Sequence, residues 1–428
     1  MKILTSATMK LDVILETLRE KRSYTQDKEI VETTRGILDQ VRKEGDKALF
    51  RLIAHYDRLQ LSSLQVASSE LKGAASQISV SLLKALKKSK ENIAKFHKQT
   101  LRLKEKQVTT QKGVSVWREF RPIERVGLYV PGGKAAYPST VLMLAVPAII
   151  AGCKDVILCT PASSDGKCNL AVLAAANLCG ITKIFKVGGA GAIAAMAYGT
   201  ETIPKVSKIF GPGNTYVTTA KMLVFGQVSI DMPAGPSEVA VIADESANPR
   251  WVAADLLSQL EHGEDSQSVL VTFSAGFAER VIQEMKAQMQ ALSRREIIKR
   301  SLEKSFAVVV RSLDEACRVV NEYAPEHLEI VVKNELAILK KINNAGSIFL
   351  GRYTNEPLGD YATGANHTLP TSGFAKMFPA LSTESFGKMI QVQKVSKEGI
   401  GNLKETVETM ASSEGLDAHR NAVSVRFS

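Results

Sequence analysis

Apolar positions recur at helical spacing over the first part of the chain. In residues 31–54 and 82–103 they return every three to four positions, with turn signals between the two stretches. The pattern therefore predicts a helical N-terminal region over residues 1–120. From about residue 121 short β-rich runs alternate with helical stretches, which is typical of βαβ units and a parallel sheet.

Two such series follow one another. In the first, strands are predicted at Val126–Val130, Val156–Cys159, Lys183–Val187 and Lys208–Phe210, with helices at Ser139–Ala151, Leu170–Leu178 and Ala192–Tyr198. In the second, strands are predicted at Val239–Ala243, Ser268–Phe273, Ala307–Arg311, Leu328–Val332 and Ser347–Leu350, with helices between them. We therefore predict an α/β protein with two Rossmann-like, doubly wound domains, over residues 121–236 and 237–381.

The last segment, residues 382–428, is short and basic, with a helical pattern near Lys404–Ser412. A segment of this length cannot bury a core by itself, so we expect it to pack on something else, such as a second subunit.

The composition fits this picture. A chain of 428 residues is too long for one core, and 45% hydrophobic with 23% charged residues is ordinary for a globular enzyme. The longest apolar run, Val141–Gly152, is too short for a membrane span and is expected to be a buried helix. The N-terminus lacks the apolar region of a signal peptide, which favours a cytoplasmic protein.

The net charge of +11 comes largely from Leu83–Lys106. Its apolar residues keep helical spacing and aromatic residues are scarce, so we expect a solvated helix face in preference to a nucleic-acid-binding surface. The five cysteines include no C-x-x-C pair, and their odd number favours reduced, buried thiols over disulfides or a thiolate zinc site.

Several groups with catalytic or metal-binding chemistry lie in the second half of the chain. Gln259 and His262 are three residues apart at the end of a helical pattern, so both can face one space and offer ligands to zinc. Their spacing alone is more typical of a solvated helix end. The other candidates are the adjacent Glu326 and His327, suited to proton transfer, then Asp360 in a glycine-rich loop, and Glu414 and His419 near the C-terminus.

One glycine-rich turn matches a dinucleotide-binding pattern. Gly189–Ala194 reads G-x-G-x-x-A after a predicted strand and before a predicted helix. A single match is weak evidence, and lysines, Lys205 and Lys208, occupy the segment in which a ribose-binding carboxylate would be sought.

The segment from residue 230 to 262, I-D-M-P-A-G-P-S-E-V-A-V-I-A-D-E-S-A-N-P-R-W-V-A-A-D-L-L-S-Q-L-E-H, closely resembles the signature of histidinol dehydrogenases. Six other motifs resemble the same family in the same order: V-G-L-Y-V-P-G-G-K-A-A-Y-P-S-T-V-L-M, A-M-A-Y-G-T-E-T-I-P, K-I-F-G-P-G-N, A-P-E-H-L-E, G-D-Y-A-T-G-A-N-H-T-L-P-T and E-G-L-D-A-H-R-N-A-V. Together they cover about residues 30–425, and a set this long is highly specific.

The resemblance implies a function and a fold. The family oxidises L-histidinol to L-histidine through L-histidinaldehyde, in two NAD-dependent steps that end histidine biosynthesis. Its fold resembles that of aldehyde dehydrogenases. It forms homodimers in which the C-terminal tail, here residues 382–428, reaches the neighbouring subunit.

The resemblance also implies roles for individual residues, carried over motif by motif. The ligands of one zinc ion per subunit would be Gln259, His262, Asp360 and His419. Glu326 would activate water and His327 would act as the general base. Substrate contacts would come from Ser237, Glu414, His327 and the four zinc ligands, and NAD contacts from Tyr129 and Asn214.

One position departs from the family pattern. Gly191 stands where the family has a glutamine whose side chain contacts NAD, so we expect weaker NAD binding. The same change creates the G-x-G-x-x-A match described above, which therefore does not count as a dinucleotide fingerprint.

Two alternative functions are weighed against this one. The first is a paralogue that oxidises another small alcohol with the same groups, and the second is a basic binding protein without catalysis. The presence of Ser237, Asp360, Glu414 and His419 favours histidinol, and the intact Glu326–His327 pair argues against lost catalysis.

Overall fold

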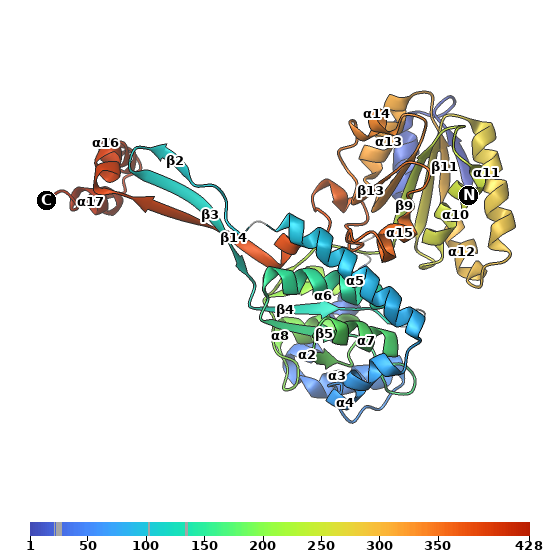
Figure 1. Ribbon diagram of the computed structural model, residues 1–428, viewed down its shortest axis with the longest axis horizontal. Helices are drawn as coiled ribbons and strands as arrows, with labels where there is room; N and C mark the ends of the chain where they lie inside the picture. The colour runs from blue at the N-terminus through green and yellow to red at the C-terminus, as the bar shows by residue number, and fades with distance from the viewer. Residues whose placement is uncertain (21, 23–27, 102, 133–135) are drawn as a thin grey trace.

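The computed structural model describes residues 1–20, 22, 28–101, 103–132 and 136–428. The molecule has two α/β lobes and a long arm that projects from one of them (Figure 1). The chain starts in the second lobe, crosses to the first, and runs out and back through the arm over residues 108–122. It then builds the first sheet, returns to the second lobe for residues 238–361, and crosses back to the first lobe before it enters the arm again.

The first lobe is built on a five-stranded parallel sheet in the order β6-β5-β4-β7-β8. One face is covered by α5, α6 and α7, and the other by α2, α8 and α9. The strands are β4 (Arg125–Tyr129), β5 (Asp155–Cys159), β6 (Lys183–Phe185), β7 (Lys208–Phe210) and β8 (Ser229–Ile230). The helices are α2 (Lys28–Glu44), α3 (Asp46–Leu52), the π-helical turn η1 (Ile53–Asp57), α4 (Ser68–Gly73), the 3₁₀ turn η2 (Ala74–Ser76), α5 (Val80–Thr100), α6 (Pro138–Ala151), α7 (Leu170–Leu178), α8 (Gly189–Tyr198) and α9 (Thr215–Val224).

The second lobe has a six-stranded parallel sheet in the order β1-β11-β10-β9-β12-β13. Helices α1 and α13 pack on one face, and α10, α11 and α12 pack on the other. The strands are β1 (Lys2–Thr5), β9 (Glu238–Ala243), β10 (Gln267–Thr272), β11 (Phe306–Val309), β12 (His327–Val331) and β13 (Ser347–Leu350). The helices are α1 (Leu11–Glu20), α10 (Pro249–Leu260), α11 (Ala275–Met289), α12 (Arg295–Leu302), α13 (Leu313–Tyr323), α14 (Glu335–Leu339) and α15 (Glu356–Tyr361).

The two sheets share one topology, and it confirms the predicted fold class. In each, the first βαβ strand of the series, β4 or β9, lies inside the sheet, and later strands are added first on one side and then on the other. This is the doubly wound order, which leaves a switch point beside the central strand.

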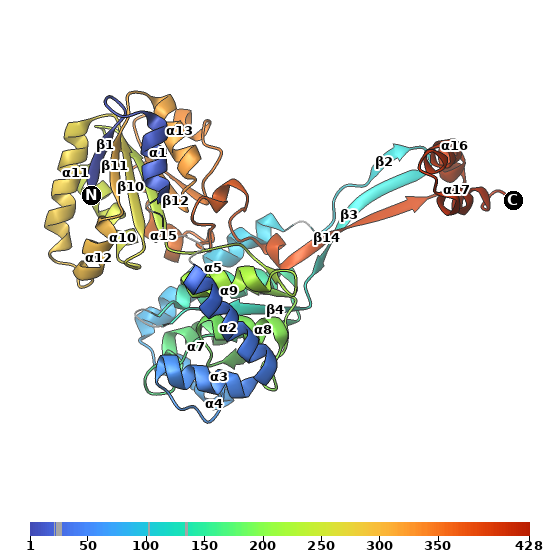
Figure 2. The same cartoon turned by 180° about the vertical axis from the view of Figure 1, so that it is seen from behind.

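The arm is a three-stranded antiparallel ribbon with two helices at its tip (Figure 2). Its strands are β2 (Val108–Gln111), β3 (Val114–Pro122) and β14 (Gly387–Val395), and β14 pairs with β3 along its whole length. The tip consists of α16 (Lys397–Ser413) and α17 (Asp417–Ser424), and the 3₁₀ turns η3 (Phe374–Lys376) and η4 (Thr383–Phe386) precede the arm. At its base, Phe386 stacks on Phe210 with ring centroids 3.9 Å apart.

One expectation about the ends of the chain is wrong. The region 1–120 is not purely helical, because β1 extends the second sheet beside β11 and residues 108–122 supply two strands of the arm. The helical pattern predicted near Lys404–Ser412 lies in α16, and β14 precedes this helix. Both β1 and β14 pair with segments that are far away in sequence. The exact domain boundaries stay a prediction.

Other expectations are confirmed. The run Val141–Gly152 coincides with the buried helix α6 and the residue that follows it. All five cysteines are free thiols, and four of them are buried, whereas Cys153 is only partly buried. Among the residues that the structure describes, no helix is both long and apolar enough to cross a membrane.

Candidate functional site

A cavity of about 520 Å³ lies between the two lobes. The first lobe supplies the carboxyl ends of β4 and β7, including Tyr129 and Asn214. The second lobe supplies Ser237, Glu326 and His327, which lie at the amino ends of β9 and β12. Ligands of doubly wound sheets are expected at the carboxyl edge. The first lobe follows this rule, whereas the second lobe turns its opposite edge to the cavity.

Gln259 and His262 both line the cavity, as their spacing predicted. The helical explanation needs a correction, however, because α10 ends at Leu260 and His262 lies in the following turn, where its N–H donates to the carbonyl oxygen of Gln259 at 3.3 Å. Burial lowers the pKa of His262, which keeps its imidazole neutral and able to bind a metal.

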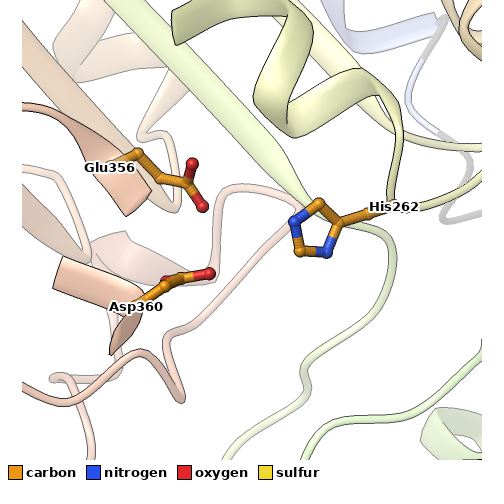
Figure 3. Close-up of side chains that lie close together, drawn as sticks. All are labelled: His262, Glu356 and Asp360. Atoms are coloured by element: carbon orange, nitrogen blue, oxygen red, sulfur yellow. The ribbon is translucent and has the colours of Figure 1, made fainter. Parts of the chain in front are cut away.

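Asp360 reaches the cavity from the short helix α15. Asn355 caps this helix by accepting the N–H of Leu358 at 3.3 Å, and Pro357 occupies its first turn. Glu356 and Asp360 are one turn apart, so they share a face. Both point toward His262, and one possible ligand atom from each of the three lies within 4.8 Å of the others (Figure 3).

The sequence analysis missed Glu356. Its signal was its position four residues before Asp360, which matters only if the segment is helical. Burial and the neighbouring Asp360 raise the pKa of Glu356 to about 8. Two ionised carboxylates this close together in a buried site repel each other and destabilise the folded state, unless a proton or a cation lies between them.

The side-chain amide of Gln259 also faces Glu356, and its two orientations differ in the atom that they present to this acid. In one orientation its nitrogen donates to Glu356 Oε1 at 3.1 Å and its oxygen accepts the N–H of Glu238 at 2.9 Å. In the other, the amide oxygen faces Glu356, acceptor against acceptor, while its nitrogen lies 3.4 Å from Glu326 Oε2. Only a shared proton or a cation stabilises the second orientation. Asp360 Oδ1 is buried without a hydrogen-bond partner in the described chain, so the donor set fits a divalent cation.

The Glu326–His327 pair is placed by the end of α13 and the start of β12. The helix ends at Tyr323, the following residue Ala324 has a left-handed φ of 48°, and Pro325 cannot continue the helix. His327 then opens β12, with its Nδ1 3.2 Å from the carbonyl oxygen of Glu238 and its Nε2 3.7 Å from Asp360 Oδ1. A carbonyl can only accept, so Nδ1 carries the proton and Nε2 faces the cavity as the basic atom.

Burial shifts the ionisation of this pair. Burial is the main reason that the pKa of Glu326 is raised to about 8, and the nearby charges of Glu238 and Asp360 contribute to this value. Burial by itself would lower the pKa of His327, but the negative charges of Glu326 and Asp360 outweigh it and raise the pKa to about 10. Perturbed acids and bases grouped in one cavity are typical of catalytic sites.

A second cavity of about 410 Å³ adjoins the first through three shared lining residues, Tyr129, Gly132 and Asn214. Its wall includes the N-terminus of α8, where the N–H of Gly189 donates to the Tyr129 hydroxyl at 3.1 Å. Gly191 lies in the first turn of α8 and not in a loop, and it also lines this cavity. The motif residues 133–135 lie outside the described residues.

Glu414 and His419 lie at the tip of the arm. Glu414 follows α16, His419 belongs to α17, and both are exposed. Neither lines the cavity between the lobes, and the tip is far from the second lobe (Figures 1 and 2). Within one chain, the structure brings together Ser237, Gln259, His262, Glu326, His327 and Asp360, but not Glu414 and His419.

The chain resembles known proteins over almost its whole length. The family model described as histidinol dehydrogenase matches residues 20–427. A histidinol dehydrogenase of Bacteroides thetaiotaomicron is 51% identical over 408 residues, which is 95% of either chain. One from Clostridium acetobutylicum is 45% identical over 427 residues, covering 100% of this chain and 99% of the relative. The crystal structure of histidinol dehydrogenase from Elizabethkingia anophelis has a TM-score of 0.95 at 43% identity, covering 100% of this chain and 98% of that one.

Proposed function

The chain belongs to the histidinol dehydrogenase family, and from this premise we propose that it oxidises L-histidinol to L-histidine through L-histidinaldehyde, with NAD and a zinc ion. It is an oxidoreductase of histidine biosynthesis. One observation carries the finer proposal: Gln259, His262, Asp360 and the Glu326–His327 pair, which are up to 101 residues apart, line a single cavity. Its location in the cytoplasm stays a prediction.

We assign three zinc ligands to this chain, namely Gln259, His262 and Asp360. The close approach of His262, Glu356 and Asp360, and the lack of a hydrogen-bond partner for the buried Asp360 Oδ1, support a cation here. Glu356 adds negative charge beside them. When bound, zinc would supply a template that orients the substrate's imidazole and amine, and NAD would accept hydride.

His327 acts as the general base in this proposal. Its Nδ1–H is tied to the carbonyl of Glu238, so Nε2 takes the alcohol proton as hydride leaves the substrate carbon. The negative charge of Asp360 helps to raise the pKa of His327, and a cation bound there would offset that charge and favour the neutral imidazole that a base requires.

Glu326 acts at the aldehyde stage. Its raised pKa suits an acid that exchanges a proton with water near neutral pH, and it lies beside His327, with Glu326 Oε2 3.6 Å from Nδ1. It removes a proton from the water that adds to the aldehyde. After His327 has released the alcohol proton to solvent, it acts again as the base and takes a proton from the hydrate as the second hydride leaves. Loss of the remaining acid proton to solvent then gives the carboxylate.

The cofactor would extend from Tyr129 and Asn214 into the second cavity. These residues line both cavities, so a dinucleotide held there could place its reactive ring beside His327. The proposed place for the pyrophosphate is the N-terminus of α8.

Replacing Gly191 with glutamine is expected to tighten NAD binding about 2- to 10-fold, the worth of one added hydrogen bond. The new Cβ would lie 3.5 Å from Leu49 and 3.7 Å from Leu52, which is ordinary contact, so the helix tolerates it. Calorimetric titration with NAD gives the dissociation constant directly, and Gly191→Ala serves as the control. An unchanged or weaker affinity in the glutamine variant would count against the proposed contact.

We also infer a homodimer in which the arm completes the partner's site. The fourth zinc ligand and a further substrate contact would then be His419 and Glu414 of the partner subunit. The exposed apolar side chains of the arm's tip, which include Met410, Leu416 and Val425, support burial against another surface.

The proposed reaction has a defined yield. Purified protein is expected to form two NADH for each L-histidine produced from L-histidinol, and a chelator is expected to stop the reaction until zinc is restored. Absorbance of NADH together with amino-acid analysis measures the ratio. One NADH per turnover, or full activity in metal-free protein, would contradict the mechanism.

A further inference from the structure

We propose that Glu238 is a positioning residue, because its backbone N–H and its backbone carbonyl hold Glu326 and His327 in place. The inference rests on the catalytic roles proposed above for these two residues. Glu238 is the first residue of β9 and is 3% exposed. Its own side chain points away from substrate chemistry and into a buried ionic contact with Arg22.

The backbone of Glu238 contacts both members of the catalytic pair. Its N–H donates to Glu326 Oε2 at 2.9 Å, and its carbonyl oxygen lies 3.2 Å from His327 Nδ1. Strands β9 and β12 are parallel neighbours, with His327 opposite Val239, so these contacts come from adjacent strand ends. A small shift of the Glu238 backbone would move both of these groups and would loosen the hydrogen bond that sets the tautomer of His327.

The side chain of Glu238 anchors this residue at two points. Glu238 Oε2 lies 3.1 Å from Arg22 Nη2, and Oε1 accepts the N–H of Ser372 at 3.1 Å. The Arg22 and Glu238 side chains are 8% and 4% exposed, so their interaction is little screened by water. Arg22 lies where the chain leaves the second lobe after α1, and Ser372 lies where it returns from that lobe. The contacts of Glu238 with Arg22 and Ser372 therefore connect two places where the chain passes between the lobes to strand β9, whose first residue contacts Glu326 and His327.

Arg22 is itself held firmly. Its guanidinium carbon lies 3.7 Å from the ring centroid of Tyr323, and the hydroxyl of Tyr323 donates to Gln267 Oε1 at 2.7 Å. The positive charge of Arg22 also offsets the carboxylate of Glu238, which would otherwise stand uncompensated beside Glu326. A purely structural ion pair would affect stability alone, whereas a positioning role predicts a specific loss of turnover.

The test compares Arg22→Met with Arg19→Met. Arg19 makes an exposed contact of 2.7 Å with Glu322, so it controls for the loss of a charge near the end of α1. We expect Arg22→Met to lower kcat about 10- to 100-fold, as for other residues that support a site, while zinc content and KM for L-histidinol stay within about 2-fold. Arg22→Lys should recover part of the loss, and Arg19→Met should match the unsubstituted enzyme.

A second variant guards against misfolding. In Arg22→Met the carboxylate of Glu238 is left buried and unpaired, so adding Glu238→Gln should restore thermal stability and raise kcat above that of Arg22→Met alone. A normal kcat in Arg22→Met despite a lower Tm would show that the pair is only structural and would overturn the inference. Loss of zinc would also overturn it, because the effect would then act through the metal site.

The inference can be tested without turnover. In protein labelled with ¹⁵N-histidine, the Nδ1–H form of His327 should be visible, assigned by its disappearance in His327→Asn, and should be lost in Arg22→Met. If the unsubstituted protein forms no NADH from L-histidinol, the proposed function fails while this spectrum still decides the positioning role. An unchanged His327 signal in Arg22→Met would overturn the inference.

Discussion

Asp360→Asn is expected to leave a folded protein that holds no zinc and turns over L-histidinol more than about 100-fold more slowly, because even residues that only support metal ligands cost 10- to 100-fold. The substitution removes the charge that faces His262 and Glu356 across the proposed metal position. It also removes a repulsion between two buried acids, so the metal-free fold should not be weakened.

Metal analysis after dialysis, together with NADH formation, measures this effect. Asp314→Asn is the matched control, since Asp314 makes an exposed contact of 2.5 Å with Lys341 far from the cavity. Added zinc should reactivate the chelated unsubstituted enzyme but not Asp360→Asn. A full zinc complement in the variant would remove Asp360 from the ligand set.

Two inactive variants are expected to restore one another when they share a dimer. His327→Asn damages the cavity between the lobes, and His419→Asn damages the tip of the arm. If the arm serves the neighbouring subunit, a mixed dimer has one site with both lesions and one with none. It should therefore show about half the activity of the unsubstituted dimer.

Co-expression with two affinity tags yields the mixed dimer for this measurement. The matched control combines His327→Asn with Asp360→Asn, because both lesions then lie in the body of a subunit and each site keeps one. That control should be inactive. An inactive mixed dimer in the first experiment would mean that the arm does not complete the partner's site.

The two lobes were predictable because their signals are local. Strands of a parallel sheet are buried on both faces, so runs such as Val239–Ala243 are continuously apolar, and the helices between them keep their own period. The predicted strands match β4–β7 and β9–β13 within two residues at their ends. The two-residue strand β8 was missed.

The arm was not predictable by the same means. Strand β14, Gly387–Val395, mixes lysine and glutamine with isolated apolar residues and is largely exposed, so no burial pattern marks it. Its partner β3 lies more than 260 residues earlier in the chain. Pairing over such a distance depends on how the lobes have already folded.

The residues of the site divide in a similar way. Ser237, Gln259, His262, Glu326, His327 and Asp360 could be named from motifs, because their residue types carry the chemistry. Glu356 and Glu238 could not. Glu356 belongs to the site because it lies one helical turn before Asp360, which requires that the segment is a helix. Glu238 acts through its backbone N–H and carbonyl, and a pattern of side-chain types does not predict where those groups point.

The sequence by itself determined the two doubly wound sheets, the family and the residue types of the site, because periodicity and motifs reflect local burial and chemistry. Only the tertiary structure decided that the second lobe presents the amino ends of its strands to the cavity, and that the arm carries Glu414 and His419 away from it. Both depend on packing between segments hundreds of residues apart. Local hydrogen bonding and hydrophobic period contain no information about such distances.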